Sequence, residues 1–269
     1  MSSEIWSADA SGDLQIHTDE RGVATVMLNR PDQRNALSMA LIRALHQAAT
    51  VLEARNEVRV VVLAGLGSIF CSGGDLEWMR GILDQSDERK AEDALELAHM
   101  LDAFHRLSKP VIARVQGGAY GGGVGLMSVA DIVIAADDAV FALAEVRLGV
   151  IPATISPYVI ARTGVAQGRS LMVTGRPIDA GSAQRIGLVD IICDAASLGD
   201  VLDREVANAL ATAPGSAAHI KRLLSRFSTQ PHTHFQPCID ELVAVWNSSE
   251  AAEGVTAFLQ KRKPVWFRR

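Results

Sequence analysis

Two glycine-rich stretches decide the fold of this chain: FCSGGDL at residues 70–76 and GGAYGGGVGL at residues 117–126. Both place glycines where an apolar strand pattern ends and a helical pattern begins. Glycine there allows positive φ angles and close backbone approach, and the unpaired N–H groups of a helix start can stabilise a negative oxygen. Two such donors that converge on one point form an oxyanion hole, although either stretch alone is also typical of a tight turn.

Other glycine-rich motifs do not fit these stretches. The sequence has no GKS or GKT, which a P-loop requires, and no GxGxxG followed by an acidic residue about twenty positions later, as in dinucleotide-binding proteins. It also lacks GxSxG, the motif that carries the nucleophilic serine of α/β-hydrolases, so the sequence does not support a serine nucleophile of that type. The glycines therefore point to an oxyanion site or to turns.

Around these stretches, strands alternate with helices, which predicts an α/β core with crossover connections over residues 1–200. Ser38 is expected to cap a helix that carries an apolar stripe through Leu52, and a second helix is expected over residues 87–107. Strands are expected at LQIH (14–17), VATVMLN (23–29), VRVVVLAG (58–65), PVIARVQG (110–117), DIVIAAD (131–137) and VFAL (140–143).

Beyond the core the pattern becomes helical only, which predicts a C-terminal helical region over residues 201–269. Helices with apolar stripes are expected over about 198–211, 217–227, 234–246 and 251–261. Such a tail either folds back on its own core or packs against another subunit.

Composition excludes several classes of function. The chain has 269 residues, 48% hydrophobic and 21% charged, with a net charge of −5, which is the wrong sign for a dedicated nucleic-acid surface. No apolar run is long enough to cross a membrane, and the acidic, polar N-terminus differs from a targeting peptide, so we expect a cytoplasmic protein. Cys71, Cys193 and Cys238 show no CxxC spacing, and His232 and His234 lack further ligands, so neither a disulfide framework nor a metal site is expected.

The order of the two glycine stretches, followed by FALAEVRLGVIP at 141–152 and EGVTAFLQKRKPVW at 253–266, resembles the enoyl-CoA hydratase/isomerase family, also called the crotonase family. The resemblance runs from NRPDQRNAL at 29–37 to the tail. It implies an α/β crotonase-like ββα spiral core and a C-terminal region that forms a homotrimer or a dimer of trimers. It also implies an acyl-CoA thioester substrate and no separate cofactor, because CoA is carried by the substrate.

The resemblance further implies roles for particular residues. The backbone N–H groups of Gly74 and Gly122 would hold the thioester oxygen, an arrangement worth roughly 3 to 4 kcal/mol per donor in comparable sites. CoA would contact Arg34, Ala36, Asp75 and Leu76, while Phe258 and Lys261 would approach the nucleotide end, often that of a neighbouring subunit. A basic run such as KRK is otherwise typical of a solvated face.

The family's hydratases usually carry two glutamates, and this chain keeps only the second, Glu145, because Gly125 stands at the first position. Apolar neighbours on both sides of Glu145 predict a desolvated carboxyl with a raised pKa. One carboxylate can take a proton from water and return it to the α-carbon, or move a proton between C2 and C4. The first reaction makes a syn-adding enoyl-CoA hydratase, which we favour, and the second a Δ3,Δ2-enoyl-CoA isomerase.

Two further segments, IPATISPYVIARTG at 151–164 and FCSGGDLEWM at 70–79, resemble hydratases of branched or carboxylated substrates, such as methylglutaconyl-CoA and isohexenylglutaconyl-CoA. Arg147 is a candidate partner for a distal carboxylate, or a structural ion-pair residue, and Trp78 is a candidate pocket or core residue. An alternative of another class is a binding protein without chemistry, for instance an RNA binder that uses Lys221, Arg222 and Arg226. The retained Glu145 and oxyanion glycines argue against it.

Overall fold

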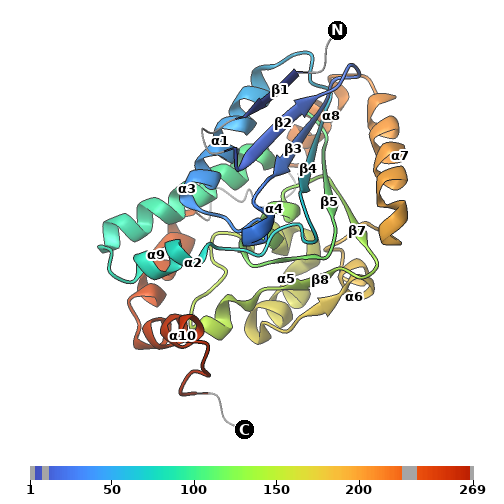
Figure 1. Ribbon diagram of the computed structural model, residues 1–269. Helices are drawn as coiled ribbons and strands as arrows, with labels where there is room; N and C mark the ends of the chain where they lie inside the picture. The colour runs from blue at the N-terminus through green and yellow to red at the C-terminus, as the bar shows by residue number, and fades with distance from the viewer. Residues whose placement is uncertain (1–3, 8–11, 226–234, 267–269) are drawn as a thin grey trace.

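The computed structural model describes residues 4–7, 12–225 and 235–266. Its main feature is a seven-stranded sheet in the order β1-β2-β3-β4-β5-β7-β10. The antiparallel pairs are β1–β2 and β2–β3, and the strands from β3 to β10 pair in parallel (Figure 1). The strands are β1 (Glu4–Ser7), β2 (Leu14–Thr18), β3 (Val23–Leu28), β4 (Val60–Gly65), β5 (Val111–Val115), β7 (Ile132–Ala136) and β10 (Ile191–Cys193).

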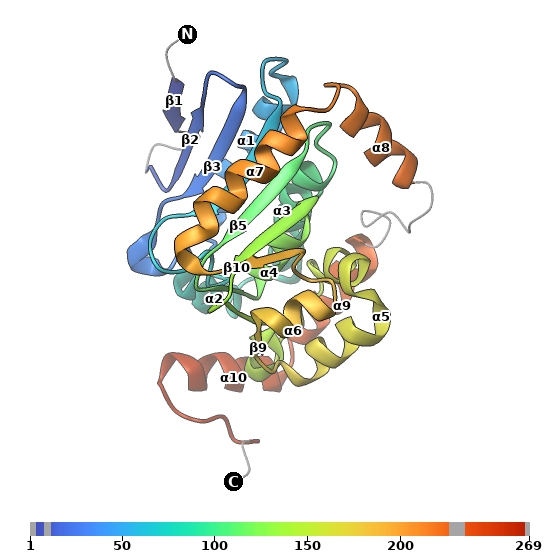
Figure 2. The ribbon, with the colours of Figure 1, turned by 90° about the vertical axis from the view of Figure 1, so that its right-hand side faces the viewer.

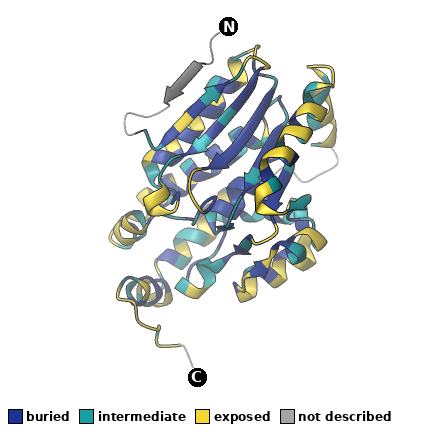
Figure 3. Ribbon diagram, turned by 45° about the vertical axis from the view of Figure 1, so that its right-hand side comes forward, coloured by how far each residue is buried: buried dark blue, intermediate teal, exposed yellow. Residues whose placement is uncertain are grey.

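Helices cover both faces of this sheet. On one face α1 (Met39–Ala54) and α3 (Asp87–His105) pack against the strands, and on the other face lies α7 (Leu198–Leu210), as Figure 2 shows. Every residue of β4 is buried in consequence, so this strand shows an unbroken apolar run instead of alternation (Figure 3). The predicted cap of α1 is confirmed, since Ser38 Oγ accepts from the Leu41 N–H at 3.2 Å.

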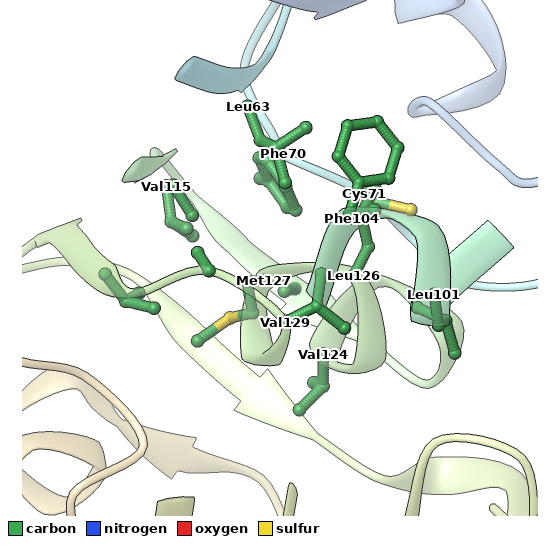
Figure 4. Packing of buried hydrophobic residues seen from close by; sticks show 14 of the residues in the cluster. Leu63, Phe70, Cys71, Leu101, Phe104, Val115, Val124, Leu126, Met127 and Val129 are labelled. Atoms are coloured by element: carbon green, nitrogen blue, oxygen red, sulfur yellow. The ribbon is translucent and has the colours of Figure 1, made fainter. Parts of the chain in front are cut away.

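A three-stranded second sheet, in the order β6-β8-β9, contains part of the second glycine stretch in β6. Its strands are β6 (Gly118–Tyr120), β8 (Val140–Ala142) and β9 (Ile178–Asp179). The short helix α4 (Gly122–Ser128) is buried beside it, with Val124, Leu126 and Met127 packed among residues of the main core, including Phe70 (Figure 4). The remaining elements here are α5 (Ser156–Thr174), α6 (Ala180–Arg185) and the 3-10 turns η1 (Pro31–Gln33), η2 (Ala144–Leu148) and η3 (Ala195–Ser197).

The C-terminal region is helical, as predicted: after α7 come α8 (Ser216–Leu224), α9 (Phe235–Trp246) and α10 (Ser249–Leu259). Helix α9 packs on α3, and α10 packs on η2 and on α2 (Leu76–Ile82), so these two helices fold back on their own core. Helix α8, by contrast, exposes Ile220, Leu223 and Leu224. Arg226, His232 and His234 lie outside the described residues. Over the described part of the chain, no helix combines the length and the apolar character that crossing a bilayer requires.

Candidate active site

The two glycine-rich stretches meet in space, as the sequence suggested. The Leu37 N–H donates to the Gly73 carbonyl at 2.7 Å, and the Asp75 N–H donates to the Leu37 carbonyl at 3.1 Å, which fixes Gly74 between them. From the second stretch, the Tyr120 N–H donates to the Cys71 carbonyl at 3.0 Å. These backbone bonds hold the ends of two strands and the start of α4 together.

Two N–H groups remain for a ligand at this junction. The Gly121 N–H is used, since it donates to the Ala142 carbonyl at 2.9 Å. Gly122 is the first residue of α4, where an N–H has no partner inside the helix. Within the described part of the chain, neither the Gly74 nor the Gly122 N–H donates to another protein group, and both glycines line one cavity. The pair therefore has the composition of an oxyanion hole.

The cavity beside these glycines has a volume of about 90 Å³ and walls that are almost entirely apolar. Glu145 provides the one ionisable side chain among its described lining residues. The other residues of the lining are Leu37, Ile42, Gly74, Trp78, Met79, Leu97, Gly122, Leu148, Val150, Ile151, Pro152, Thr154, Ile155, Leu242 and Trp246.

Glu145 lies on η2, shortly after strand β8, and its carboxyl faces the second glycine stretch at Gly121. A Cβ atom at position 121 would lie only 2.8 Å from Glu145 Oε1, so glycine at 121 makes room for this carboxyl. Oε2 is buried and has no hydrogen-bond partner among the described residues. Desolvation by burial raises the pKa of Glu145 to about 7, which confirms the expected direction. A carboxyl with this pKa can accept and donate a proton near neutral pH.

The structure also shows what fills the position of the missing glutamate. A Cβ atom at position 125 would lie 2.3 Å from Cγ2 and 2.7 Å from Cβ of Ile155, so a second carboxylate cannot enter from α4 without displacing Ile155. The nearby Thr154 is 6% exposed and lines the cavity. Among the described lining residues, the Thr154 hydroxyl and the Glu145 carboxyl can therefore accept a hydrogen bond from a water molecule.

The residues predicted to hold CoA near the oxyanion site lie beside it. The Arg34 carbonyl accepts from the Ser72 N–H at 3.0 Å, and its exposed guanidinium lies 5.9 Å from the centre of the Tyr120 ring. Ala36 is buried and directly precedes Leu37, whose backbone bonds to Gly73 and Asp75 are described above. Leu76 is half exposed. The segment around Arg34 and Ala36 therefore forms a rim next to the first glycine stretch.

Asp75 has a structural task at this rim. Its Oδ1 caps α2 by accepting from the Glu77 N–H at 2.9 Å, and its Oδ2 forms a 2.9 Å ion pair with Arg30. Sequence reasoning missed Asn35, which is fully buried: its amide donates to the carbonyls of Leu66 and Ile69, each at 2.9 Å. Left-handed backbone at Asn35, with φ 54°, turns the chain here, and Asn is one of the residues that tolerates this conformation.

Phe258, Lys261 and Arg147 are not brought to the cavity. Phe258 is 49% exposed near the end of α10, and Lys261 is exposed just beyond that helix. Arg147 is exposed on η2, although it lies only two residues after Glu145. None of the three belongs to the lining residues. A role in substrate binding would therefore require a part of the ligand, or a second subunit, that contacts them outside the cavity.

Comparison with known proteins decides the family. Residues 18–269 match the family profile described as enoyl-CoA hydratase/isomerase. The chain belongs to this family. It is 33% identical over 249 residues to enoyl-CoA hydratase AKT6-1 of Alternaria alternata, covering 91% of this chain and 81% of that protein. It is 31% identical over 273 residues to the mitochondrial enoyl-CoA hydratase of Pongo abelii, covering 96% and 90%.

Solved structures agree with this assignment. An enoyl-CoA hydratase from Mycobacterium avium subsp. paratuberculosis K-10 superposes with a TM-score of 0.82 at 27% identity, over 95% of this chain and 99% of that one. Pseudomonas aeruginosa AtuE superposes with a TM-score of 0.78 at 34% identity, over 95% and 100%. The crotonase fold and the prediction of an enzyme of this family are confirmed.

Proposed function

We propose that this family member is an enoyl-CoA hydratase that adds water syn across the 2,3 double bond of a 2-enoyl-CoA thioester. The observation that carries the proposal is the Glu145 carboxyl, whose Oε2 is buried without a hydrogen-bond partner among the described residues, in the same cavity as the free N–H groups of Gly74 and Gly122. The names of the relatives quoted above support the same activity.

The proposed reaction uses one carboxylate twice. Glu145 removes a proton from water while the water oxygen bonds to C3, and the electron pair of the double bond moves toward the thioester oxygen. The N–H groups of Gly74 and Gly122 stabilise that oxygen as it becomes negative. Glu145 then gives its proton to C2, the carbonyl re-forms, and the net change is the addition of one water molecule.

The second candidate is a Δ3,Δ2-enoyl-CoA isomerase, which the single carboxylate favours. One relative, 26% identical over 252 residues, is a trans-2-decenoyl-[acyl-carrier-protein] isomerase of Streptococcus mutans. Incubation of a 2-enoyl-CoA panel in ¹⁸O-labelled water separates the two reactions. A hydratase places the label at C3 of a 3-hydroxyacyl-CoA, whereas double-bond migration in 3-enoyl-CoAs without any hydroxylated product would establish the isomerase.

For the ends of the substrate, we propose that Arg34, Ala36, Asp75 and Leu76 contact CoA, and that Phe258 and Lys261 contact the nucleotide end bound to a neighbouring subunit. This requires a homotrimer or a dimer of trimers in which the region 201–269 supplies subunit contacts. The exposed apolar residues of α8 are consistent with such contacts. Sedimentation should show a stable oligomer at micromolar concentration, and a monomer would remove Phe258 and Lys261 from the site. A cytoplasmic location and the methylglutaconyl-CoA subgroup stay predictions.

A further inference from the structure

One wall of the cavity is built from segments far apart in the sequence. Trp78 and Met79 of α2, the loop after η2, and Leu242 and Trp246 of α9 all line it. The same segments, with α10, form a small apolar cluster that is separate from the main core. Two indole rings, those of Trp78 and Trp246, thus form part of this wall.

The ring of Trp78 closes the cavity beside the oxyanion site. A Cβ atom at Gly74 would lie 3.2 Å from Cζ3 and 3.5 Å from Cε3 of Trp78, so the six-membered ring lies against this glycine. At the other end of the indole, Nε1 donates to Asp93 Oδ2 at 3.0 Å. The side chain thus spans from the oxyanion glycine to helix α3.

Buried charges on α3 hold this wall in place. Asp93 is 1% exposed and also forms a 3.0 Å ion pair with Arg89, one helical turn earlier. Lys90 is 4% exposed and donates to Asn247 Oδ1, directly after Trp246. The Asn247 amide in turn donates to Asp87 at 2.6 Å. Charges are costly to bury unless partners compensate them. Here the partners of Asp93 are Trp78 and Arg89, and the partner of Lys90 is Asn247, the residue that follows Trp246.

The described lining residues include no Lys, Arg or His. A carboxylate on the acyl chain would therefore enter an apolar cavity without a cationic partner, next to the Glu145 carboxyl, and would lose its hydration without compensation. An uncharged chain has no such cost.

We propose that Trp78, positioned by Asp93, sets the acyl-chain limit of this enzyme, and that the cavity takes a short, uncharged acyl group. This preference goes against the carboxylated substrates, such as methylglutaconyl-CoA, that the resemblance in sequence implies. The proposal rests on the proposed function, because it assumes that the cavity beside Gly74 and Gly122 holds the acyl chain. Trp78 acts on chain length by direct contact, and Asp93 is a positioning residue that acts through it.

Calorimetry with saturated straight-chain acyl-CoAs from four to twelve carbons tests the limit without any turnover. Each methylene that enters an apolar pocket strengthens binding by about fourfold. In the wild type this gain should stop at a short chain, and in Trp78→Ala it should continue for at least two more methylenes, about a 15-fold increase in the preference for the longer chain. Trp78→Phe, which keeps a ring, covers the case in which Trp78→Ala does not fold, and its limit should be extended by a smaller amount.

Asp93→Leu keeps the Trp78 side chain but removes the hydrogen-bond acceptor that positions it. It should extend the chain-length limit in the same direction and raise the KM of longer 2-enoyl-CoAs less than that of the four-carbon one. The matched control is Arg80→Ala, at an exposed position of α2, the helix that carries Trp78. Arg80 does not line the cavity, so this variant should leave the chain-length profile unchanged. An identical chain-length profile in Trp78→Ala, Trp78→Phe and the wild type would overturn the proposal.

Glutaryl-CoA and pentanoyl-CoA test the charge preference, with wild type expected to bind the uncharged chain at least about tenfold more tightly. Equal or tighter binding of glutaryl-CoA would contradict it. The binding assays and the ¹⁸O incorporation test different claims. A chain-length limit without hydration would refute the proposed function alone, and hydration without a Trp78-dependent limit would refute this inference alone.

Discussion

Replacement of Glu145 by Gln should make the protein more stable at alkaline pH. In the folded state burial raises the pKa of this carboxyl from 4.5 to about 7. Between these two values the native state binds more protons than the unfolded chain, so stability falls as pH rises. The full penalty, about 3 kcal/mol above pH 8, follows from 1.36 kcal/mol per pKa unit. Gln is neutral at every pH and does not pay it.

Urea unfolding at pH 5 and at pH 8, at one fixed protein concentration, measures this effect. The stability gained by Glu145→Gln should be roughly 2 kcal/mol larger at pH 8 than at pH 5. Glu77→Gln, at an exposed position of α2, is the control and should show no such difference. An equal effect of Glu145→Gln at both pH values would show that the carboxyl is not desolvated, and the reasoning about its proton transfer would fail.

Three other substitutions test the surroundings of the site. Gly125→Ala should cost about 1–3 kcal/mol through its clash with Ile155, and a double-mutant cycle with Ile155→Gly should recover part of that cost; strict additivity would contradict the packing argument. Asn35→Ala should cost about 2–4 kcal/mol in denaturant unfolding, because one buried and one partly buried hydrogen bond to carbonyl groups lose their donor, and a loss below 1 kcal/mol would count against it. Thr154→Val should lower the hydration rate at least about tenfold while Thr154→Ser retains most of it, if the hydroxyl helps to hold water; equal rates in steady-state assays would exclude this role.

The strands and helices with strong periodicity could be predicted from the sequence. The hairpin strands around residues 19–22, the Ser38-capped helix, the buried run in β4 and the helical tail all appear where the pattern placed them. The strands β1, β6, β9 and β10 and the helices α5 and α6 were not predicted, and for α2 the sequence indicated only a helical start after the first glycine stretch. Helix α5 contains Gly164 with a φ of 71°, which breaks its apolar period, while α2 and α6 are each about two turns long and give little periodicity.

The site was predictable where chemistry needs a backbone conformation. The glycine stretches indicated an oxyanion site or turns, and the resemblance to the crotonase family then pointed to Gly74 and Gly122 within them. The apolar neighbours of Glu145 indicated its desolvation. Contacts across the fold could not be inferred in this way. The packing of Ile155 against Gly125 and the bond from Trp78 to Asp93 join residues 30 and 15 positions apart through tertiary packing, which leaves no periodic signal in the sequence.

The central claim is that Glu145 performs both proton transfers of water addition, with the Gly74 and Gly122 N–H groups holding the thioester oxygen. Its most direct test is the turnover of Glu145→Gln on the 2-enoyl-CoA that the wild type hydrates fastest, together with calorimetric binding of the saturated analogue. The account predicts that turnover falls at least roughly 10²-fold while analogue binding persists, because Gln keeps the shape but cannot exchange the proton. Near wild-type turnover in this variant would contradict it.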